Sequence, residues 1–410
     1  MRAGPVGHKL APMRILVVSP RFPHAAVRSG LAIVYQRIRR LAARGHEVGL
    51  ISFVSEEDRP HLEAMREGLF ALETVPRPPP APAWKKAWRS WRTPPPFDYA
   101  QGTPMARRIG DMVERDEYQV VLVEFSEMAP CLVRNPWLPA VRTVMSCHQC
   151  ATIASQKRCD VLGYSLEGLW ERWRRDRLLR YEFPVYRQMD HVLVLSPQER
   201  WQMLNYAPDL RITVIPYGVD VAAFRPPEIE TERRGLLFTG YYSDEQNRDA
   251  VLWFLRHVWP HVVARRPDTT FHVVGPDPTP AMRAMGEIDL RVRVTNRVPD
   301  VRPYLHRAAV FVCPVRMGSG MRGKILEAMA AGTPVVTTSV GAEGIPAVPG
   351  ENCFVADDPV VMANHIEWLL ADEGLRRRLA ENARRVVAER FSWDYTISRL
   401  EETLERVLEY

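Results

Sequence analysis

The stretch from residue 309 to residue 344 constrains the fold of this chain more than any other. Its sequence, AVFVCPVRMGSGMRGKILEAMAAGTPVVTTSVGAEG, predicts a strand, a glycine-rich loop, a helix and a second strand. Small residues let the backbone of such a loop approach a ligand, and the N-terminus of the next helix presents free N–H groups to an anion. The segment therefore indicates an α/β fold with a phosphate-binding loop between Gly318 and Lys324.

Two familiar phosphate loops fit this segment in part. The glycines match G-x-G-x-x-G, and the string ending in the lysine nearly matches the nucleoside triphosphate loop. The triphosphate loop needs a hydroxyl residue after the lysine to hold Mg²⁺, and Ile325 follows here. A dinucleotide site needs an acidic residue at the end of the next strand, which instead ends in Thr338 and Ser339. A glycine turn with a purely structural role remains an alternative.

The composition limits the class of protein. A chain of 410 residues with 46% hydrophobic residues is long enough for two domains, and no apolar run reaches the roughly 18–20 residues of a membrane span. Residues 1–12 lack the apolar region of a signal peptide and are expected to be a flexible extension. Six scattered cysteines suit a reduced, cytoplasmic protein. The net charge of +6 suits an anionic partner, but no nucleic-acid-binding motif accompanies it.

Apolar runs and helical patterns alternate through both halves of the chain. In the first half, buried strands are predicted at residues 14–19, 46–52, 118–125, 140–147 and 190–196. In the second half, they are predicted at residues 235–240, 270–275, 291–298 and 309–314, with a helix around residues 247–263. This alternation predicts two doubly wound α/β domains, each with a parallel sheet.

Two segments resemble a known family. The helix after the glycine loop contains Glu327 in LEAMAAGTPVV, and residues 211–226 read RITVIPYGVDVAAFRP. Both are similar to elements of the GT-B retaining glycosyltransferases of the GT4-like family, also called glycosyl transferases group 1. The resemblance implies two Rossmann-like domains facing a cleft. It places an N-terminal acceptor-side domain at residues 13–215, a nucleotide-sugar-binding domain at 216–393, and a helix at 394–410 that crosses back to the first domain.

The resemblance also implies a donor site. The glycine loop would face the diphosphate of a UDP or GDP sugar, Glu327 would bind the ribose, and backbone around residues 296–299 would bind the base. Two positions depart from the family pattern: Ser319 replaces the first glutamate of the E-x7-E motif, and Gly240 is not followed by the usual Arg and Lys. The expected donor-binding residues are Gly240, Asn247, Arg248, Val298, Arg316, Gly318, Ser319, Gly320, Met321, Gly323 and Glu327.

The expected catalytic residues are His148, Lys324 and Arg322. The two cations would stabilise the charge that grows on the leaving diphosphate, and His148 follows a strand at the edge where such sheets bind ligands. Ser29, Gly30, Glu124 and Glu127 are the acceptor-side candidates. A structural histidine and a solvated carboxylate rim are the alternatives.

The resemblance implies sugar transfer to a hydroxyl acceptor, with retention and without a metal or other cofactor. The acceptor would belong to a polysaccharide, a glycolipid or another glycoconjugate. The alternative is an inactive GT-B module that only binds a nucleotide sugar or a partner.

One insertion bears on the location of the protein. Residues 76–98 place Trp84, Trp88 and Trp91 on one face of a short helix, among four Lys and Arg residues and between two proline runs. This pattern suits a weak contact with an anionic membrane, and packing against the N-terminal domain is the alternative. A second candidate segment, residues 169–183, contains interspersed acids and is expected to be an ordinary surface helix.

Overall fold

The computed structural model describes residues 11–25, 27, 30–78, 82, 93–94, 97, 103–226, 232–318 and 320–410. The insertion with Trp84, Trp88 and Trp91 lies outside the described residues, as do Ser29, Ser319 and residues 1–10.

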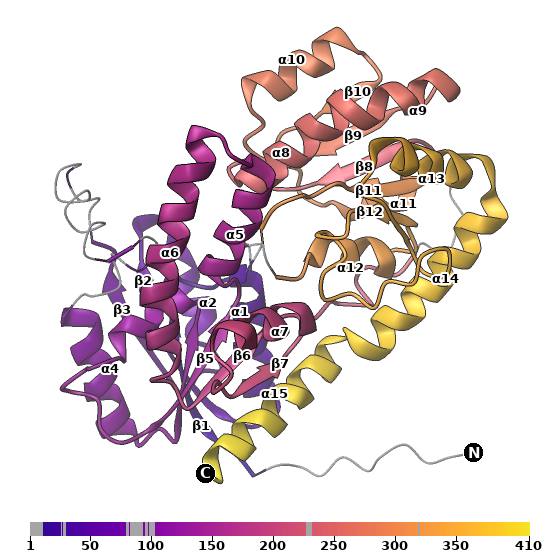
Figure 1. Ribbon diagram of the computed structural model, residues 1–410. Coiled ribbons are helices and arrows are strands. Elements are labelled where there is room, and N and C mark those ends of the chain that lie inside the picture. The colour runs from indigo at the N-terminus through magenta and orange to yellow at the C-terminus, as the bar shows by residue number, and fades with distance from the viewer. Residues whose placement is uncertain are drawn as a thin grey trace.

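The first half of the chain builds a seven-stranded parallel sheet in the order β3-β2-β1-β4-β5-β6-β7 (Figure 1). Central strands such as β1 and β4 are apolar on both faces, because helices cover the sheet on both sides. The strands are β1 (Arg14–Ser19), β2 (Glu47–Val54), β3 (Ala71–Pro76), β4 (Val120–Glu124), β5 (Arg142–Cys147), β6 (His191–Val194) and β7 (Ile212–Val214). β3 was not expected, because this edge strand is half-buried and lacks a continuous apolar run.

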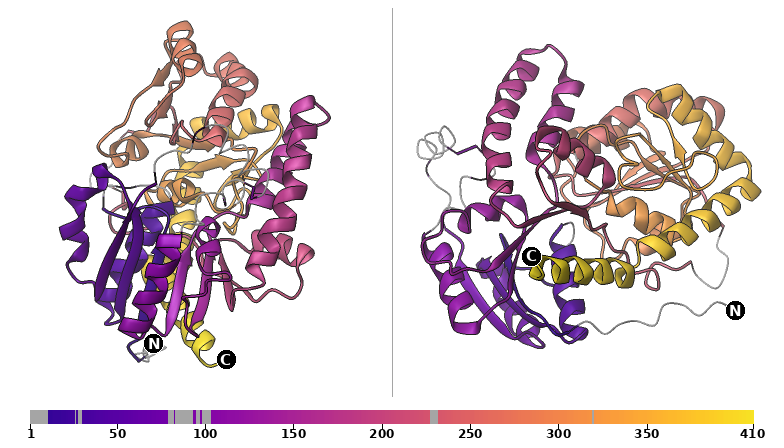
Figure 2. Two further views of the ribbon diagram at one scale, coloured as in Figure 1. Left: turned by 90° about the vertical axis from the view of Figure 1, so that its left-hand side faces the viewer. Right: turned by 60° about the horizontal axis from the view of Figure 1, so that its bottom comes forward.

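The helices of this half connect the strands by crossovers on the two faces of the sheet. They are α1 (Gly30–Ala43), α2 (Leu62–Arg66), α4 (Thr103–Asp116), α5 (Ala151–Leu162), α6 (Leu166–Tyr186) and α7 (Pro197–Tyr206), with 3₁₀ turns at Glu56–His61 and Ser126–Cys131. Two of them, α5 and α6, form an antiparallel hairpin that extends away from the sheet toward the second domain (Figures 1 and 2).

The second half builds a six-stranded parallel sheet in the order β10-β9-β8-β11-β12-β13. Its strands are β8 (Leu236–Thr239), β9 (Phe271–Val274), β10 (Val292–Val294), β11 (Val310–Cys313), β12 (Val335–Thr337) and β13 (Phe354–Val355). The predicted α/β class with two parallel sheets is confirmed.

The helices of the second half lie on both faces of its sheet. They are α8 (Glu245–Trp253), α9 (Trp259–Arg265), α10 (Pro280–Ile288), α11 (Arg302–Arg307), α12 (Gly323–Ala330), α13 (Pro359–Ala371) and α14 (Glu373–Arg390). The helix expected around residues 247–263 is present, but a π-helical turn at Phe254–Val258 interrupts its α-helical geometry just before Pro260.

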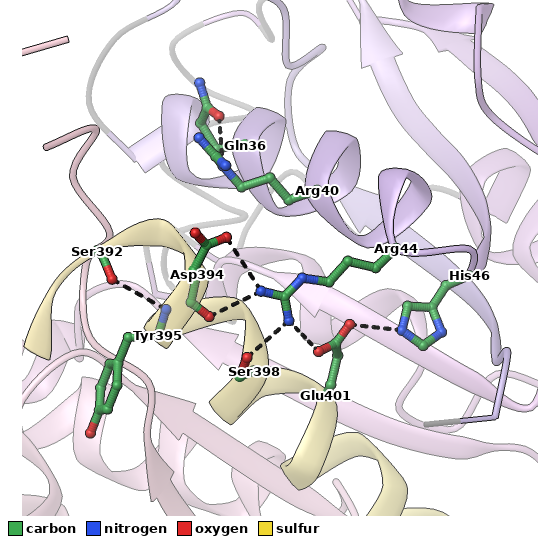
Figure 3. Close-up of polar contacts among 9 residues, drawn as sticks. All are labelled: Gln36, Arg40, Arg44, His46, Ser392, Asp394, Tyr395, Ser398 and Glu401. Carbon is green, nitrogen blue, oxygen red and sulfur yellow. Dashed lines mark hydrogen bonds and ion pairs between the residues drawn. The ribbon is translucent and has the colours of Figure 1, made fainter. Parts of the chain in front are cut away.

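The last helix, α15 (Trp393–Leu408), leaves the second domain and packs against α1 and β5 of the first (Figures 1 and 2). One buried carboxylate fixes it there. Glu401 accepts a hydrogen bond of 2.6 Å from Arg44 Nη1, and its other oxygen lies 3.0 Å from His46 Nε2 (Figure 3). The amide of Met13 in turn donates to His46 Nδ1, so the contact reaches the first strand.

No helix in the described part of the chain has both the length and the apolar character needed to cross a bilayer.

Candidate active site between the two domains

The predicted glycine loop lies between β11 and α12, at the carboxyl end of the second sheet. Gly318 and Gly320 have φ angles of +94° and +83°, a region that side-chain-bearing residues rarely adopt. Space is also short at the next glycine, since a Cβ at Gly323 would lie 2.8 Å from the ring of Tyr217. The two turns and the packed ring bring the backbone of the loop close to its neighbours just before α12.

Lys324 follows this loop on the first turn of α12. Its Nζ donates a 2.7 Å hydrogen bond to Asn247 Oδ1 and lies 4.4 Å from the ring centre of Phe238. Burial lowers the pKa of Lys324 to about 8. Gly240, the residue after β8, lies directly beside it, since an added Cβ there would lie 2.9 Å from Lys324 Nζ. The predicted residues Gly240, Asn247 and Lys324 therefore meet at one point.

The other predicted cations differ in what they already bind. The buried Arg322 donates to the backbone oxygen of Met317 across the loop, and burial lowers its pKa. Arg316 forms a two-pronged ion pair with Asp249, at 2.6 and 3.1 Å. Arg248 donates to the backbone oxygens of residues 242 and 243. The charge of Arg316 is thus balanced inside the protein, so we expect neutralisation of a bound phosphate to depend mainly on Lys324 and Arg322.

Three predicted donor residues lie around this cluster. Glu327 is half-buried on α12, and its charge adds to burial in raising the pKa of the Tyr217 phenol. Val298 is partly buried against the core of the second domain. The side chain of Met321 packs against Gly344.

The first domain contributes a buried charged network at the carboxyl ends of β4 and β5. His148 Nε2 lies 2.6 Å from Glu124 Oε2, and Arg37 Nη1 donates to both oxygens of Glu124 at 3.1 and 3.2 Å. Arg37 Nη1 also donates to Ser146 Oγ at 2.7 Å. Burial alone would raise the pKa of Glu124, but the Arg37 charge and the His148 hydrogen bond lower it to about 2.

This network fixes the state of His148. An ionised Glu124 only accepts hydrogen bonds, so Nε2 carries the proton. Burial lowers the pKa of His148, which favours the neutral ring. Nδ1 then presents a lone pair, and it has no hydrogen-bond partner among the described residues.

The surroundings of His148 are tightly built. Its ring stacks on Phe125 at 4.0 Å, and Phe125 has a φ of +69°, which is strained for a residue with a side chain. A Cβ at Gly30, the first residue of α1, would lie 2.7 Å from the Phe125 ring and 3.3 Å from His148 Nδ1. Gly30 therefore has to be a glycine, and His148 Nδ1 faces the N-terminus of α1.

The placement of Glu124 corrects one expectation. Its carboxylate is fully buried and bound by Arg37 and His148, so it cannot orient an acceptor hydroxyl directly. Glu127, in the 3₁₀ turn after β4, is half-buried.

The two halves of the site touch each other. An added Cβ at Gly320 would lie 2.9 Å from the backbone oxygen of His148. Two ion pairs also join α5 of the first domain to the second domain: Lys157 with Glu343, and Arg158 with Glu245. The structure thus brings the glycine loop, Lys324 and His148 into one region between the sheets.

Sequence reasoning missed Arg37 and Asp249. Arg37 had a detectable signal, because it falls on the apolar face of its helix with Val34 and Leu41, where a charged residue needs a buried partner. Asp249 had none, since the ion pair with Arg316 joins α8 to the distant loop after β11.

Two family models match the chain. The model for Glycosyltransferase Family 4 matches residues 32–223, and the model for Glycosyl transferases group 1 matches residues 233–372.

Two relatives of known name are mannosyltransferases. The phosphatidyl-myo-inositol mannosyltransferase of Mycolicibacterium smegmatis is 30% identical over 225 residues, covering 53% of this chain and 57% of that protein. The lipopolysaccharide core biosynthesis mannosyltransferase LpcC of Rhizobium leguminosarum is 30% identical over 233 residues, covering 53% of this chain and 64% of that protein. The matched part spans between half and two thirds of each relative.

Solved structures share the complete fold. Sucrose-phosphate synthase from Thermosynechococcus elongatus superposes with a TM-score of 0.74 at 18% identity, covering 97% of this chain and 99% of the other. The Anabaena protein HepE, solved in complex with UDP, gives 0.67 at 13% identity, covering 96% and 100%.

The two facing sheets and the matched families define an enzyme of the GT-B glycosyltransferase class. More particularly, the chain belongs to the GT4-like glycosyltransferases of group 1.

Proposed function

We propose that this enzyme transfers a sugar from a UDP or GDP sugar to a hydroxyl group of a glycolipid, polysaccharide or related acceptor. The observation that supports it most is the meeting of a cationic glycine loop from one sheet with the Glu124–His148 pair from the other. Two relatives named as mannosyltransferases of glycolipid and lipopolysaccharide synthesis, and a neighbouring structure that holds UDP, agree with this assignment.

The donor's diphosphate would bind at the start of α12. Backbone N–H groups between Gly318 and Gly323 and the positive end of the helix would meet its oxygens, and Lys324 would add a full charge. The half-buried Glu327 would accept hydrogen bonds from the two ribose hydroxyls, since an ionised carboxylate has two oxygens for a vicinal pair.

In the reaction the bond between the sugar's anomeric carbon and the phosphate oxygen breaks, and a bond to the acceptor oxygen forms on the same face. The acceptor's proton passes to the departing phosphate oxygen. Negative charge grows on the diphosphate in the transition state, where Lys324, Arg322 and the helix N-terminus stabilise it. We expect this charge to be balanced by the protein, without a metal or other cofactor.

His148 would position the reacting groups. Its neutral Nδ1 can accept a hydrogen bond from a sugar or acceptor hydroxyl, while Glu124 holds the ring in place through Nε2. The strained Phe125 and the close Gly30 leave this nitrogen a single direction to face.

We further propose that the acceptor is presented at a membrane surface and that the enzyme acts from the cytoplasm. The insertion with Trp84, Trp88 and Trp91, flanked by Lys and Arg residues, suits contact with anionic lipid.

The decisive experiment is a panel of UDP and GDP sugars assayed for release of UDP or GDP, with and without lipid and oligosaccharide acceptors, and repeated in EDTA. Turnover that persists in EDTA and retains the anomeric configuration would support the proposal. Tight binding of a nucleotide sugar with no hydrolysis or transfer to any acceptor would support the inactive binding module instead.

A further inference from the structure

The tip of the α5–α6 hairpin exposes an apolar surface that the site does not use. We call it the hairpin face: Tyr164, Leu166, Leu169, Trp170 and Trp173. These side chains are 89%, 86%, 53%, 59% and 50% exposed. Four of them follow the spacing i, i+3, i+4 and i+7 on α6, so they form a single stripe along the helix. An apolar stripe normally faces the core, and this one faces solvent at the end of an extended arm (Figure 2).

Arginines continue the stripe and border it. Arg177 and Arg180 follow Trp173 at four and seven positions, on the same side of the helix. The Arg177 guanidinium lies 4.7 Å from the ring centre of Trp173, and that of Arg172 lies 4.3 Å from the ring centre of Tyr164. Aromatic rings and cations are thus combined in one surface.

The two buried acids of this segment do not share the surface. Glu171 and Glu182 are buried on the opposite side of α6, where they bind residues of α5 and the turn before it. Of the exposed acids on this helix, Asp176 lies beside the stripe, three positions after Trp173, and its charge is paired with Arg175, while Glu167 lies at the edge of the stripe. The hairpin face is therefore apolar, and its border carries more arginines than acids, with Asp176 already neutralised by Arg175.

We propose that the hairpin face docks the enzyme on an anionic lipid bilayer. Tryptophan and leucine side chains would enter the headgroup region, tyrosine would sit at its edge, and the arginines would meet lipid phosphates. The five side chains cover less than three helical turns, which suits reversible peripheral binding rather than permanent insertion.

The charge distribution favours lipid over a second copy of the chain. A twofold dimer would place the same patch on both sides, so the interface would hold the positive charges of Arg177 and Arg180 twice over. An anionic bilayer instead complements them.

Docking would also orient the region between the two sheets where the proposed site lies. The neighbouring helix of the hairpin, α5, is tied to the second domain by the ion pairs Lys157–Glu343 and Arg158–Glu245. A hairpin held at the bilayer would therefore hold both domains at a fixed angle to it. The proposal adds a binding surface to the proposed function and does not depend on the transfer reaction.

The test is co-sedimentation of the full chain with vesicles of phosphatidylcholine alone or with phosphatidylglycerol. We expect binding only to the anionic vesicles, declining with salt. The variant Trp170→Ser/Trp173→Ser should weaken it by roughly tenfold or more. The control Trp201→Ser/Trp368→Ser removes two other exposed tryptophans, 65% and 52% exposed, and should bind as the parent does.

Four outcomes would overturn the inference. Two concern the variants: the hairpin variant and the control variant bind vesicles equally, or binding is lost only when Trp84, Trp88 and Trp91 are replaced. The third is equal binding of the parent protein to neutral and anionic vesicles. The fourth is a dimer in solution that the hairpin variant abolishes. Circular dichroism and release of UDP or GDP from a soluble donor, compared among the variants, separate docking from folding and from transfer.

Discussion

Lys324 carries a positive charge in a buried environment that disfavours the charged form. Burial lowers its pKa to about 8, while Asn247 Oδ1 and the Phe238 ring face its Nζ. A bound diphosphate would supply the missing countercharge. We expect this residue to contribute more to the transition state than to the folded protein, because its environment is complete only when the anion is present.

Replacing Lys324 by methionine keeps the apolar stem on Phe238 and removes the charge. We expect kcat/KM to fall by about 10²–10³, corresponding to roughly 3–4 kcal/mol of lost transition-state stabilisation. Steady-state release of UDP or GDP measures this, and the thermal unfolding midpoint serves as the control for folding. An unchanged rate would remove Lys324 from the mechanism.

The pKa of Lys324 also predicts a pH dependence. In the free enzyme the charged form is lost as pH rises through about 8, so kcat/KM should decline above that pH. The variant Lys324→Arg should lose this alkaline decline, because arginine stays protonated. The same shift affects stability with the opposite sign. Between about 8 and the unfolded value of 10.5 the unfolded chain binds the extra proton, so the free energy of unfolding contributed by this group rises with pH.

Arg37 is the buried countercharge of Glu124. The variant Arg37→Met leaves that carboxylate without its cation, and we expect a loss of about 3–5 kcal/mol in the free energy of unfolding. The double variant Arg37→Met/Glu124→Gln removes both charges and should recover a large part of the loss. Urea unfolding followed by circular dichroism provides both values. Equal destabilisation by the single and double variants would contradict the pairing.

At the residue scale, the sequence predicted which residues belong to the candidate site better than it predicted the ion pairs that these residues form. Gly240, Asn247 and Lys324 were expected to share one site, and the structure places them side by side. The sequence could not show that Asp249 already neutralises Arg316, or that Glu124 points inward to Arg37. Such pairings depend on side chains from separate crossovers, and local patterns do not encode them.

Among the elements, the glycine loop sets how closely the two domains approach. Gly320 has a left-handed φ and faces the backbone oxygen of His148. Gly320→Ala adds backbone strain of about 1–2 kcal/mol and a methyl group at that contact. We expect lower kcat/KM, measured by UDP or GDP release.

Gly45 provides the matched control for this substitution. Its φ is +96°, and a Cβ there would meet no atom within 4 Å. Gly45→Ala should therefore show the strain in unfolding experiments with no effect on turnover. An equal loss of activity in both variants would assign the effect of Gly320→Ala to strain alone.

Element prediction succeeded where burial is uniform. β1 begins and ends at the expected residues, because a strand buried on both faces has a continuous apolar run. The edge strand β3 lacks that run and was missed. The hairpin face on α6 was also missed. Its exposure depends on which side of α6 the neighbouring helix α5 covers, and the sequence of α6 does not give that.

For the molecule as a whole, the ion pairs of the hairpin, Lys157–Glu343 and Arg158–Glu245, connect the two domains. The double variant Lys157→Met/Arg158→Met removes both bridges, and we expect a more open average arrangement with a larger radius of gyration in small-angle X-ray scattering. The control Arg115→Met/Arg187→Met removes ion pairs that lie within the first domain. Identical scattering by the two variants would show that other contacts hold the domains together.

The crossing of α15 has a consequence for how the protein is made. Glu401 pairs with Arg44 across a separation of 357 positions. At a synthesis rate of about 5–20 residues per second, roughly 20 to 70 seconds pass between the appearance of these two residues. Throughout that interval, the surface of α1 that α15 finally covers stays open to solvent. The N-terminal domain is therefore the first to leave the ribosome and the last to be completed.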